Sequence, residues 1–325
     1  MKSQKTYNIP IFIPHEGCPH TCVFCNQTKI TGVQTRVTCA DVRKIISERL
    51  SYLPKNGCRI EAAFFGGSFT GLDLELQEKF LKTAAEFSDR LDGIRMSTRP
   101  DYINKEVLEL AKKYDVRTIE LGMQSSDNVV LRLNERGHRF EDTSAAAALI
   151  SEYKISLGVQ VMVGMYGSTP EKDVLTAADA ASLNPACARI YPTLTLCGTK
   201  LEQLYKQGRY APYDMETAVN VTDKMMRIFE ERGIEIIRVG LHSDESLTDG
   251  DGICAGPYHP AFRELVLSRR ERNRIEAEIL RSGLKNCIYE AHVPQDMVSV
   301  TIGHKRCNAE YFKRKYNITL KTVSG

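Results

Sequence analysis

Three cysteines near the N-terminus are spaced so that their thiolates can bind one inorganic centre. Cys18, Cys22 and Cys25 are separated by three and two residues, and Phe24 precedes the last of them. A cluster of four irons is normally held by four cysteine thiolates. Because no other cysteine lies at ligand spacing, we expect these three to hold a [4Fe–4S] cluster with one iron open to a substrate or cofactor.

Two other roles are compatible with the same residues. With His20, the cysteines offer three sulfurs and one nitrogen to a structural zinc ion, which would make the chain a non-enzymatic zinc-binding protein. Zinc sites usually contain two closely spaced cysteine pairs, and no second pair follows here. A disulfide framework is disfavoured because no secretory signal is visible and cytosolic thiols stay reduced. Six further cysteines are expected to be small buried apolar side chains: Cys39, Cys58, Cys187, Cys197, Cys287 and Cys307.

The pattern Cys-x3-Cys-x-Phe-Cys resembles the signature of the radical S-adenosylmethionine (SAM) superfamily. In that family the open iron binds the amino and carboxylate groups of SAM. The residues around the motif, 15–20 and 25–27, resemble more narrowly the group that contains the catalytic subunit of Elongator. The resemblance covers about residues 8–325 and implies that the cluster and SAM are the cofactors.

The elements that must position this motif alternate between short apolar runs and amphipathic segments. Val42, Ile46 and Leu50, for example, place apolar side chains on one face of a helix. Strands that alternate with such helices predict parallel βα units. We expect strands at 7–13, 60–65, 94–98, 116–121, 157–163, 187–193 and 234–239. About six such units predict an α/β fold with a partial (β/α)6 TIM-like barrel.

The sequence changes character after about residue 240. A loop rich in glycine and acidic residues, 243–252, precedes a charged helix over about 261–283. The tail is predicted to form a strand at 297–302, a helix at 305–315 and a strand at 318–323. We therefore expect a barrel core over 1–240 and a small C-terminal α/β extension over 241–325 that packs on the barrel.

Glycines and polar residues after the predicted strands are expected to contact SAM, because the chemistry of such barrels lies at the C-terminal ends of the strands. Gly66, Gly67 and Ser68 follow the second strand, and the glycines let the backbone approach a ligand closely. The resemblance implies that this turn holds the amino group of SAM, that Ser97 lies near its methionine part, and that Phe24 adjoins it. An ordinary βα turn is the structural alternative.

The fourth and fifth strands are expected to supply the remaining SAM contacts. Gln124 is followed twelve residues later by Arg136, an interval that resembles the radical SAM branch containing coproporphyrinogen dehydrogenase. The resemblance implies that Gln124 lies near SAM and that Arg136 binds its carboxylate, for which a planar guanidinium is suited. Gln160 is expected at the ribose hydroxyls and Met162 at the adenine, although both also suit an ordinary strand.

The open rim of the predicted barrel carries side chains that we expect to contact the substrate. These candidates are Glu120, Arg189, Tyr191, Arg238, His242 and His259. A structural ion pair is the alternative for each arginine, and a hydrogen-bonded structural role is the alternative for each histidine. The acidic loop over 244–251 is most simply solvated, but folded over the mouth it would suit a cationic or polyhydroxyl substrate.

The charge composition indicates which class of substrate the protein is expected to bind. The net charge is +3, with 44 basic and 41 acidic residues, whereas a dedicated nucleic-acid binder usually carries a denser basic stripe. A small-molecule substrate, a modified nucleoside or nucleotide, is therefore favoured, and tRNA is possible. Residues 303–306, Gly-His-Lys-Arg, resemble a GxxG RNA-binding loop without its second glycine, and we interpret them as a basic helix start. No apolar run is long enough to span a membrane, so we expect a cytoplasmic protein.

The expected chemistry is reductive cleavage of SAM to a 5′-deoxyadenosyl radical, with an electron from a donor such as flavodoxin or ferredoxin. The catalytic subunit of Elongator modifies tRNA wobble uridine and carries an acetyltransferase domain, for which the roughly 85 residues after this barrel are too few. The short architecture is similar to queuine lyases. The most specific expectation is thus a lyase of queuosine salvage that releases queuine from queuosine or queuosine 5′-phosphate. A radical SAM enzyme that modifies the wobble base of tRNA is the alternative.

Overall fold

A seven-stranded parallel sheet forms the centre of the molecule. The computed structural model describes residues 5–13, 17–18, 21–26, 36–54, 57–241 and 252–324. The strand order is β1-β2-β3-β4-β5-β6-β8, and every neighbouring pair is parallel. The strands are β1 (Lys5–Ile13), β2 (Cys58–Gly66), β3 (Gly93–Thr98), β4 (Val116–Gln124), β5 (Ser156–Val163), β6 (Cys187–Pro192) and β8 (Glu235–Val239).

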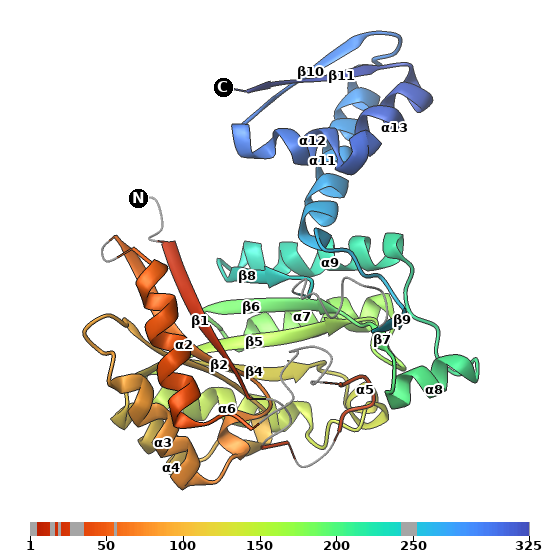
Figure 1. Ribbon diagram of the computed structural model, residues 1–325. Coiled ribbons are helices and arrows are strands. Elements are labelled where there is room, and N and C mark those ends of the chain that lie inside the picture. The colour runs from red at the N-terminus through yellow and green to blue at the C-terminus, as the bar shows by residue number, and fades with distance from the viewer. Residues whose placement is uncertain are drawn as a thin grey trace.

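Helices between the strands cover the outer face of this curved sheet (Figure 1). They are α2 (Cys39–Tyr52), α3 (Leu74–Ala85), α4 (Lys105–Lys113), α6 (Phe140–Glu152), α7 (Pro170–Ser182) and α9 (Met215–Glu231). Two shorter helices, α5 (Asn128–Leu133) and α8 (Lys200–Lys206), lie near the cysteine loop, because Val23 donates to the carbonyl of Asn134 and accepts from the N–H of Leu201. The predicted α/β partial barrel is confirmed.

Local sequence explains where these elements begin. The hydroxyl of Thr38 accepts the N–H of Asp41, whose carboxylate accepts the N–H of Thr38, so this capping box starts α2. Asn104, Thr169 and Asp214 cap α4, α7 and α9 through side-chain oxygens. In β2 the five residues 60–64 are all buried, as expected for a parallel strand that is covered on both faces.

The C-terminal tail differs from the prediction. Residues 298–302 form the helix α12 (Val298–Ile302), and the strand lies earlier, at β10 (Ile288–Val293). The alternating exposed and buried side chains of β10 are a strand pattern already visible in the sequence. The β-branched residues of α12 stay helical because packing overrides propensity. Val300 and Thr301 are buried, and the side chain of Asn308 donates to their carbonyls.

The tail continues with α13 (Cys307–Tyr316) and β11 (Thr319–Ser324), and β11 pairs with β10 in parallel. A further pair, β7 (Thr195–Leu196) and β9 (Ile253–Ala255), is antiparallel and was not predicted. A disulfide joins Cys197 to Cys254 beside this pair. Of the six cysteines predicted to be buried, only Cys187 is, and Cys307 is exposed.

Helix α11 (Phe262–Ser282) contributes side chains to two separate apolar clusters. Phe262 and Val266 belong to the cluster of the barrel, whereas Ile275 and Ile279 belong to the cluster around β10 and β11. Figure 1 shows α11 rising from α9 toward the C-terminal strands. The division into 1–240 and 241–325 stays a prediction. None of the helices in the described ranges has the length and apolar character needed to cross a bilayer.

Phe312→Ala tests this division. Phe312 is fully buried in the C-terminal cluster, so its truncation should destabilise that cluster by about 3–5 kcal/mol. Hydrogen exchange should then show lost amide protection in β10 and β11, with the seven-stranded sheet still protected. Tyr52→Ala, at an exposed side chain of α2, is the control. Equal loss of protection in both regions would show that they unfold as one unit and would contradict the division.

Candidate functional site

A cavity of about 640 Å³ opens at the C-terminal ends of the parallel strands. It brings together residues that are far apart in the sequence. Fourteen residues predicted to bind cluster, SAM or substrate line it: Cys18, Cys22, Phe24, Cys25, Gly66, Gly67, Ser68, Ser97, Gln124, Arg136, Gln160, Arg189, Tyr191 and Arg238. Their individual roles stay predictions, but their placement at one cavity agrees with a single site.

The cysteine loop is held by close backbone contacts. Gly17 has φ +74°, and a Cβ on it would lie 2.1 Å from the carbonyl oxygen of Ser68, so only glycine fits. Cys22 is buried, whereas Cys18 and Cys25 are partly exposed to the cavity. The Cys25 N–H donates to the Cys22 carbonyl at 2.9 Å, which turns the chain so that its thiols reach the same cavity.

Arg136 joins the cysteine loop to the end of β4. Its Nη1 donates to the Cys22 sulfur at 3.0 Å and its Nη2 donates to the Gly122 carbonyl at 2.6 Å. Its Nε is buried and has no hydrogen-bond partner among the described residues, and the same holds for Oε1 of Gln124. Buried polar atoms without partners are unusual in native structures. Both residues line the cavity, so a polar ligand there would satisfy them.

The donor set fits the implied cofactors. Three cysteines at one cavity suit a cluster held through three thiolates, and the unpaired atoms of Arg136 and Gln124 suit a ligand with carboxylate and amino groups. Burial raises the pKa of Cys18 above its usual value. A bound metal centre would offset that effect, because a coordinating thiol is deprotonated by the ion.

A buried ionic network lies beneath the cavity. Glu120 is fully buried and accepts from Nη1 of Arg95 at 2.9 Å and from Nε of Arg189 at 2.5 Å. Arg95 also donates to Glu61 at 2.8 Å, and Gln160 donates to Glu120 at 3.1 Å. Neighbouring strands β2 to β6 each contribute one of these residues. Burial by itself would raise the pKa of Glu120, but the two guanidiniums outweigh it and hold the pKa below its usual value.

Glu120 was predicted to contact the substrate, and the structure places it elsewhere. Both of its oxygens face the arginines and it does not line the cavity, so it orients Arg189. Met162 also does not line the cavity and packs among Val130 and Met165. His259 lies outside the cavity with its ring edge against His304. His242 and the acidic loop lie outside the described residues.

The cavity wall also contains residues that the sequence reasoning missed. Asn8, Pro10 and Phe12 occupy alternate positions of β1 and all line the cavity. Their spacing of two is the signal that would have found them once β1 was predicted. Arg49 and Arg99 line it as well. No spacing rule connects Arg49, on α2, with the cysteine motif.

The charge of the wall is one-sided. Arg49, Arg99, Arg136, Arg189 and Arg238 line the cavity, and its described lining contains no carboxylate. Two of these charges have buried or nearby partners, because Arg189 pairs with Glu120 and Arg99 pairs with Asp101. The guanidinium of Arg189 also lies 4.9 Å from the ring centre of Phe65. The surface thus suits an anionic ligand with a flat ring better than a cationic one.

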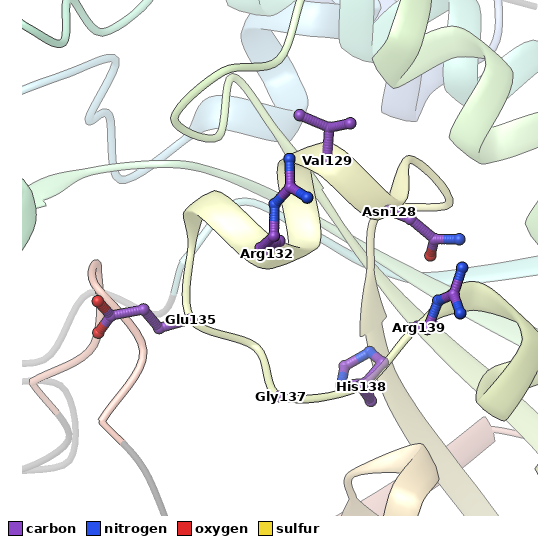
Figure 2. A pocket seen from close by; sticks show the side chains of 7 residues that line it. All are labelled: Asn128, Val129, Arg132, Glu135, Gly137, His138 and Arg139. Atoms are coloured by element: carbon purple, nitrogen blue, oxygen red, sulfur yellow. The ribbon is translucent and has the colours of Figure 1, made fainter.

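A second hollow, of about 650 Å³, lies beside the segment that carries Arg136 (Figure 2). Arg132 and Arg139, which line it, are exposed. Burial, together with Arg136, lowers the pKa of His138 to about 4, so this ring is neutral at pH 7. None of the three cysteines lines this hollow, so the candidate site is the cavity at the strand ends.

The fold and the cysteine cavity define a class of enzyme that binds an iron–sulfur cluster at the mouth of a partial barrel. Residues 12–180 match the radical SAM superfamily, and residues 185–272 match the Radical_SAM C-terminal domain. The first match covers more than half of the chain, so the chain belongs to the radical SAM superfamily and is a radical SAM enzyme.

Two curated relatives are similar to most of this chain. The chain is 29% identical over 345 residues to the tRNA uridine(34) acetyltransferase of Methanocaldococcus jannaschii, covering 93% of this chain and 62% of that protein. It is 27% identical over 302 residues to the tRNA uridine(34) acetyltransferase of Dehalococcoides mccartyi, covering 79% of this chain and 63% of that protein. The chain thus spans less than two thirds of the length of these relatives.

Two solved structures have a fold similar to that of this chain. The archaeal Methanocaldococcus infernus Elp3 superposes with a TM-score of 0.65 at 22% identity, covering 87% of this chain and 64% of that one. Coproporphyrinogen III oxidase from Escherichia coli superposes with a TM-score of 0.52 at 17% identity, covering 71% of this chain and 53% of that one. At these identities the likeness shows the fold alone.

Glu120→Gln tests the buried network. The substitution leaves Arg95 and Arg189 facing a neutral amide, and breaking a buried ion pair typically costs about 3–5 kcal/mol. The lowered pKa means that the carboxylate stabilises the fold above its unfolded pKa of about 4.3 and that this contribution is lost as the pH falls. Urea unfolding should therefore show a large difference from the wild type at pH 7 that shrinks in acid. Glu75→Gln, at an exposed pair with Lys79, is the control.

A pH-independent difference between Glu120→Gln and the wild type would contradict the ionic role of this carboxylate. It would indicate that the loss comes from altered packing of the amide.

Arg136→Gln tests the contact with Cys22. Hydrogen bonds to the sulfurs help to set the reduction potential of an iron–sulfur cluster. Loss of the cationic donor at 3.0 Å should make the reconstituted cluster harder to reduce, with the iron content close to wild type because the three cysteines remain. Potentiometric titration followed by electron paramagnetic resonance measures this shift. Arg132→Gln, an exposed arginine four residues earlier, should leave the potential unchanged, and an equal shift in both variants would refute the assignment.

Proposed function

We propose that this chain is a radical SAM enzyme that modifies a nucleoside of tRNA, with the anticodon wobble position as the favoured target. The observation that carries the proposal is the lining of the cavity, which contains, besides the three cysteines, five arginines and no described carboxylate. Such a wall favours a polyanionic substrate. The similarity to curated tRNA uridine(34) acetyltransferases supports tRNA as that substrate.

We assign one group of cavity residues to the cofactors and another group to the substrate. When bound, the cluster and SAM supply the 5′-deoxyadenosyl radical. We propose that Cys18, Cys22 and Cys25 hold the cluster and that Arg136 and Gln124 orient SAM through their unpaired buried atoms. Apart from Met162, the other predicted SAM contacts line the same cavity: Phe24, Gly66, Gly67, Ser68, Ser97 and Gln160. A one-electron carrier such as flavodoxin or ferredoxin is the proposed reductant.

The substrate side of the cavity is formed by β6, β8 and the aromatic end of β1 and β2. The Glu120 carboxylate fixes the Arg189 guanidinium through two hydrogen bonds, at 2.5 and 3.0 Å. Arg238 donates through Nε to the Gly240 carbonyl, which leaves its other nitrogens for a ligand. The rings of Phe12 and Phe65 are 6.4 Å apart at the same cavity and can contact a nucleobase.

Release of queuine from queuosine is not supported by the comparisons. The acidic loop over 244–251, which would suit a cationic substrate, lies outside the described residues. The described wall carries the opposite charge. The experiment below therefore tests queuine release as the competing reaction to tRNA modification.

Anaerobic incubation with SAM and dithionite tests the proposal. Formation of 5′-deoxyadenosine should rise when bulk tRNA is added, because substrate binding completes the site, and mass spectrometry of digested tRNA should reveal the altered nucleoside. Cys22→Ala, which removes one predicted cluster ligand, is the negative control and should form no 5′-deoxyadenosine.

Queuosine and queuosine 5′-phosphate are the competing substrates in parallel reactions. Stimulation by these compounds with release of free queuine, and none by tRNA, would overturn the proposal in favour of the lyase. No stimulation by either class would overturn both substrate assignments and leave the superfamily membership intact.

A further inference from the structure

The C-terminal strands and helices form a compact motif that contributes no residue to the lining of the cysteine cavity. Two parallel strands, β10 and β11, are joined by α12 and α13 with a tight turn between the helices. Helices joined by a Gly-x-x-Gly turn beside a sheet are the arrangement with which KH domains clamp four nucleotides of a nucleic-acid backbone. The turn here has the sequence Gly303-His304-Lys305-Arg306.

The turn adopts the conformation that glycines favour, although its second glycine is absent. Gly303 has φ +86°, and a Cβ on it would lie 2.7 Å from the Cys307 sulfur and 2.9 Å from the Asn308 nitrogen. Lys305 and Arg306 have φ of 50° and 63°, in the left-handed region that costs a non-glycine residue about 1–2 kcal/mol. Arg306 thus stands where the second glycine would, and adds a cation to the turn.

Within the described residues, the two cations of the turn have no acidic partner. Lys305 and Arg306 are exposed, and no ion pair of either occurs within the described ranges. Over residues 284–324 the basic side chains outnumber the acidic ones. The basic residues are Lys285, Lys305, Arg306, Lys313, Arg314, Lys315 and Lys321, and the acidic residues are Glu290, Asp296 and Glu310. Of these basic residues, Lys315 is paired with Glu276 of α11 at 2.7 Å.

A half-buried arginine beside α13 also lacks an acceptor. The Arg272 guanidinium lies 4.6 Å from the ring centre of Tyr311, and its Nε is buried without a hydrogen-bond partner in the described structure. Burial and the neighbouring Arg269 hold the pKa of Arg272 below its usual value. An anion bound beside α13 would supply the missing acceptor.

Contacts of the turn place it toward the barrel. The ring of His304 meets that of His259 edge-on at 4.8 Å. Tyr258, which precedes His259, packs against the cluster of Leu194 and Leu196, as does Leu241, which lines the cysteine cavity. A ligand held at residues 303–306 therefore lies on the side of the C-terminal motif that faces the barrel.

We propose that residues 303–306, with the first turns of α13, bind the sugar–phosphate backbone of a single-stranded RNA segment. This inference rests on the proposed function and deepens it, because it names the part of the chain that holds the tRNA while the target nucleoside enters the cavity. The backbone amides of the turn and the two exposed cations contact phosphates, which position the RNA without reading its sequence.

Charge reversal at the turn tests the inference. Lys305→Asp combined with Arg306→Asp removes both cations, and aspartate adopts positive φ more readily than most residues, so the turn is kept. Lys285→Asp is the control and reverses one charge, whereas the double variant reverses two. It makes the same kind of change near the other end of α13, where Asn286 accepts from the side chain of Asn317. That end lies about 15 Å from the turn, given a rise of about 1.5 Å per residue.

Filter binding of bulk tRNA at several salt concentrations supplies the readout, with thermal unfolding as the folding check. The double variant should bind at least about tenfold more weakly at low salt, and its log–log salt slope should fall by about 1.4, because each single-strand phosphate contact contributes about 0.7. Lys285→Asp should bind like the wild type. A single-stranded oligoribonucleotide should compete with the tRNA better than duplex RNA or poly-glutamate does.

The outcomes separate this inference from the proposed function. Equal tRNA binding by the double variant and the wild type would overturn the inference, even where tRNA stimulates SAM cleavage. Loss of binding in the double variant without any tRNA stimulation of the wild type would support the inference and overturn the proposed function. Better competition by poly-glutamate would assign the surface to an acidic protein, and better competition by duplex RNA would overturn the single-strand assignment.

Discussion

A buried network of ion pairs, with one neutral amide, joins neighbouring strands on which the cavity is built. Glu61, Arg95, Glu120, Gln160 and Arg189 come from β2, β3, β4, β5 and β6 in turn, and each is bonded to a neighbour in the set. A buried charge is costly unless its partner is present, so each strand must keep its register relative to the next. The same network presents Arg189 at the cavity and withdraws Glu120 from it.

The cysteine loop uses a different kind of constraint. It is anchored by backbone contacts, which include the close approach of Gly17 to Ser68 and the hydrogen bonds of Val23 to Asn134 and Leu201. The loop is thus held through its backbone, and its three cysteines line the cavity, where Arg136 donates to the Cys22 sulfur. The polar atoms that stay unpaired there mark the space that a cofactor would occupy.

The cavity lining and the C-terminal residues 284–324 both carry an excess of positive charge. Arginines dominate the described lining of the cavity, and lysines and arginines dominate residues 284–324. The overall net charge of +3 hides both concentrations, because acidic side chains elsewhere balance them. α11 connects the two regions, since its first turns pack on the barrel and its last turns pack under β10 and β11. A large polyanion that touches both regions is consistent with this distribution.

The sequence alone determined the barrel, the cysteine motif and most of the residues that meet at the cavity. It could do so because strand period, helix caps and cysteine spacing are local signals, and because parallel strands end at the same edge of a sheet. Tertiary structure decided what local patterns leave open. Only the packed sheet shows that Glu120 faces Arg95 and Arg189, away from the ligand. Burial of Val300 and Thr301 made 298–302 helical against their β-branched preference, and the parallel pairing of β10 with β11 depends on contacts between residues about thirty positions apart.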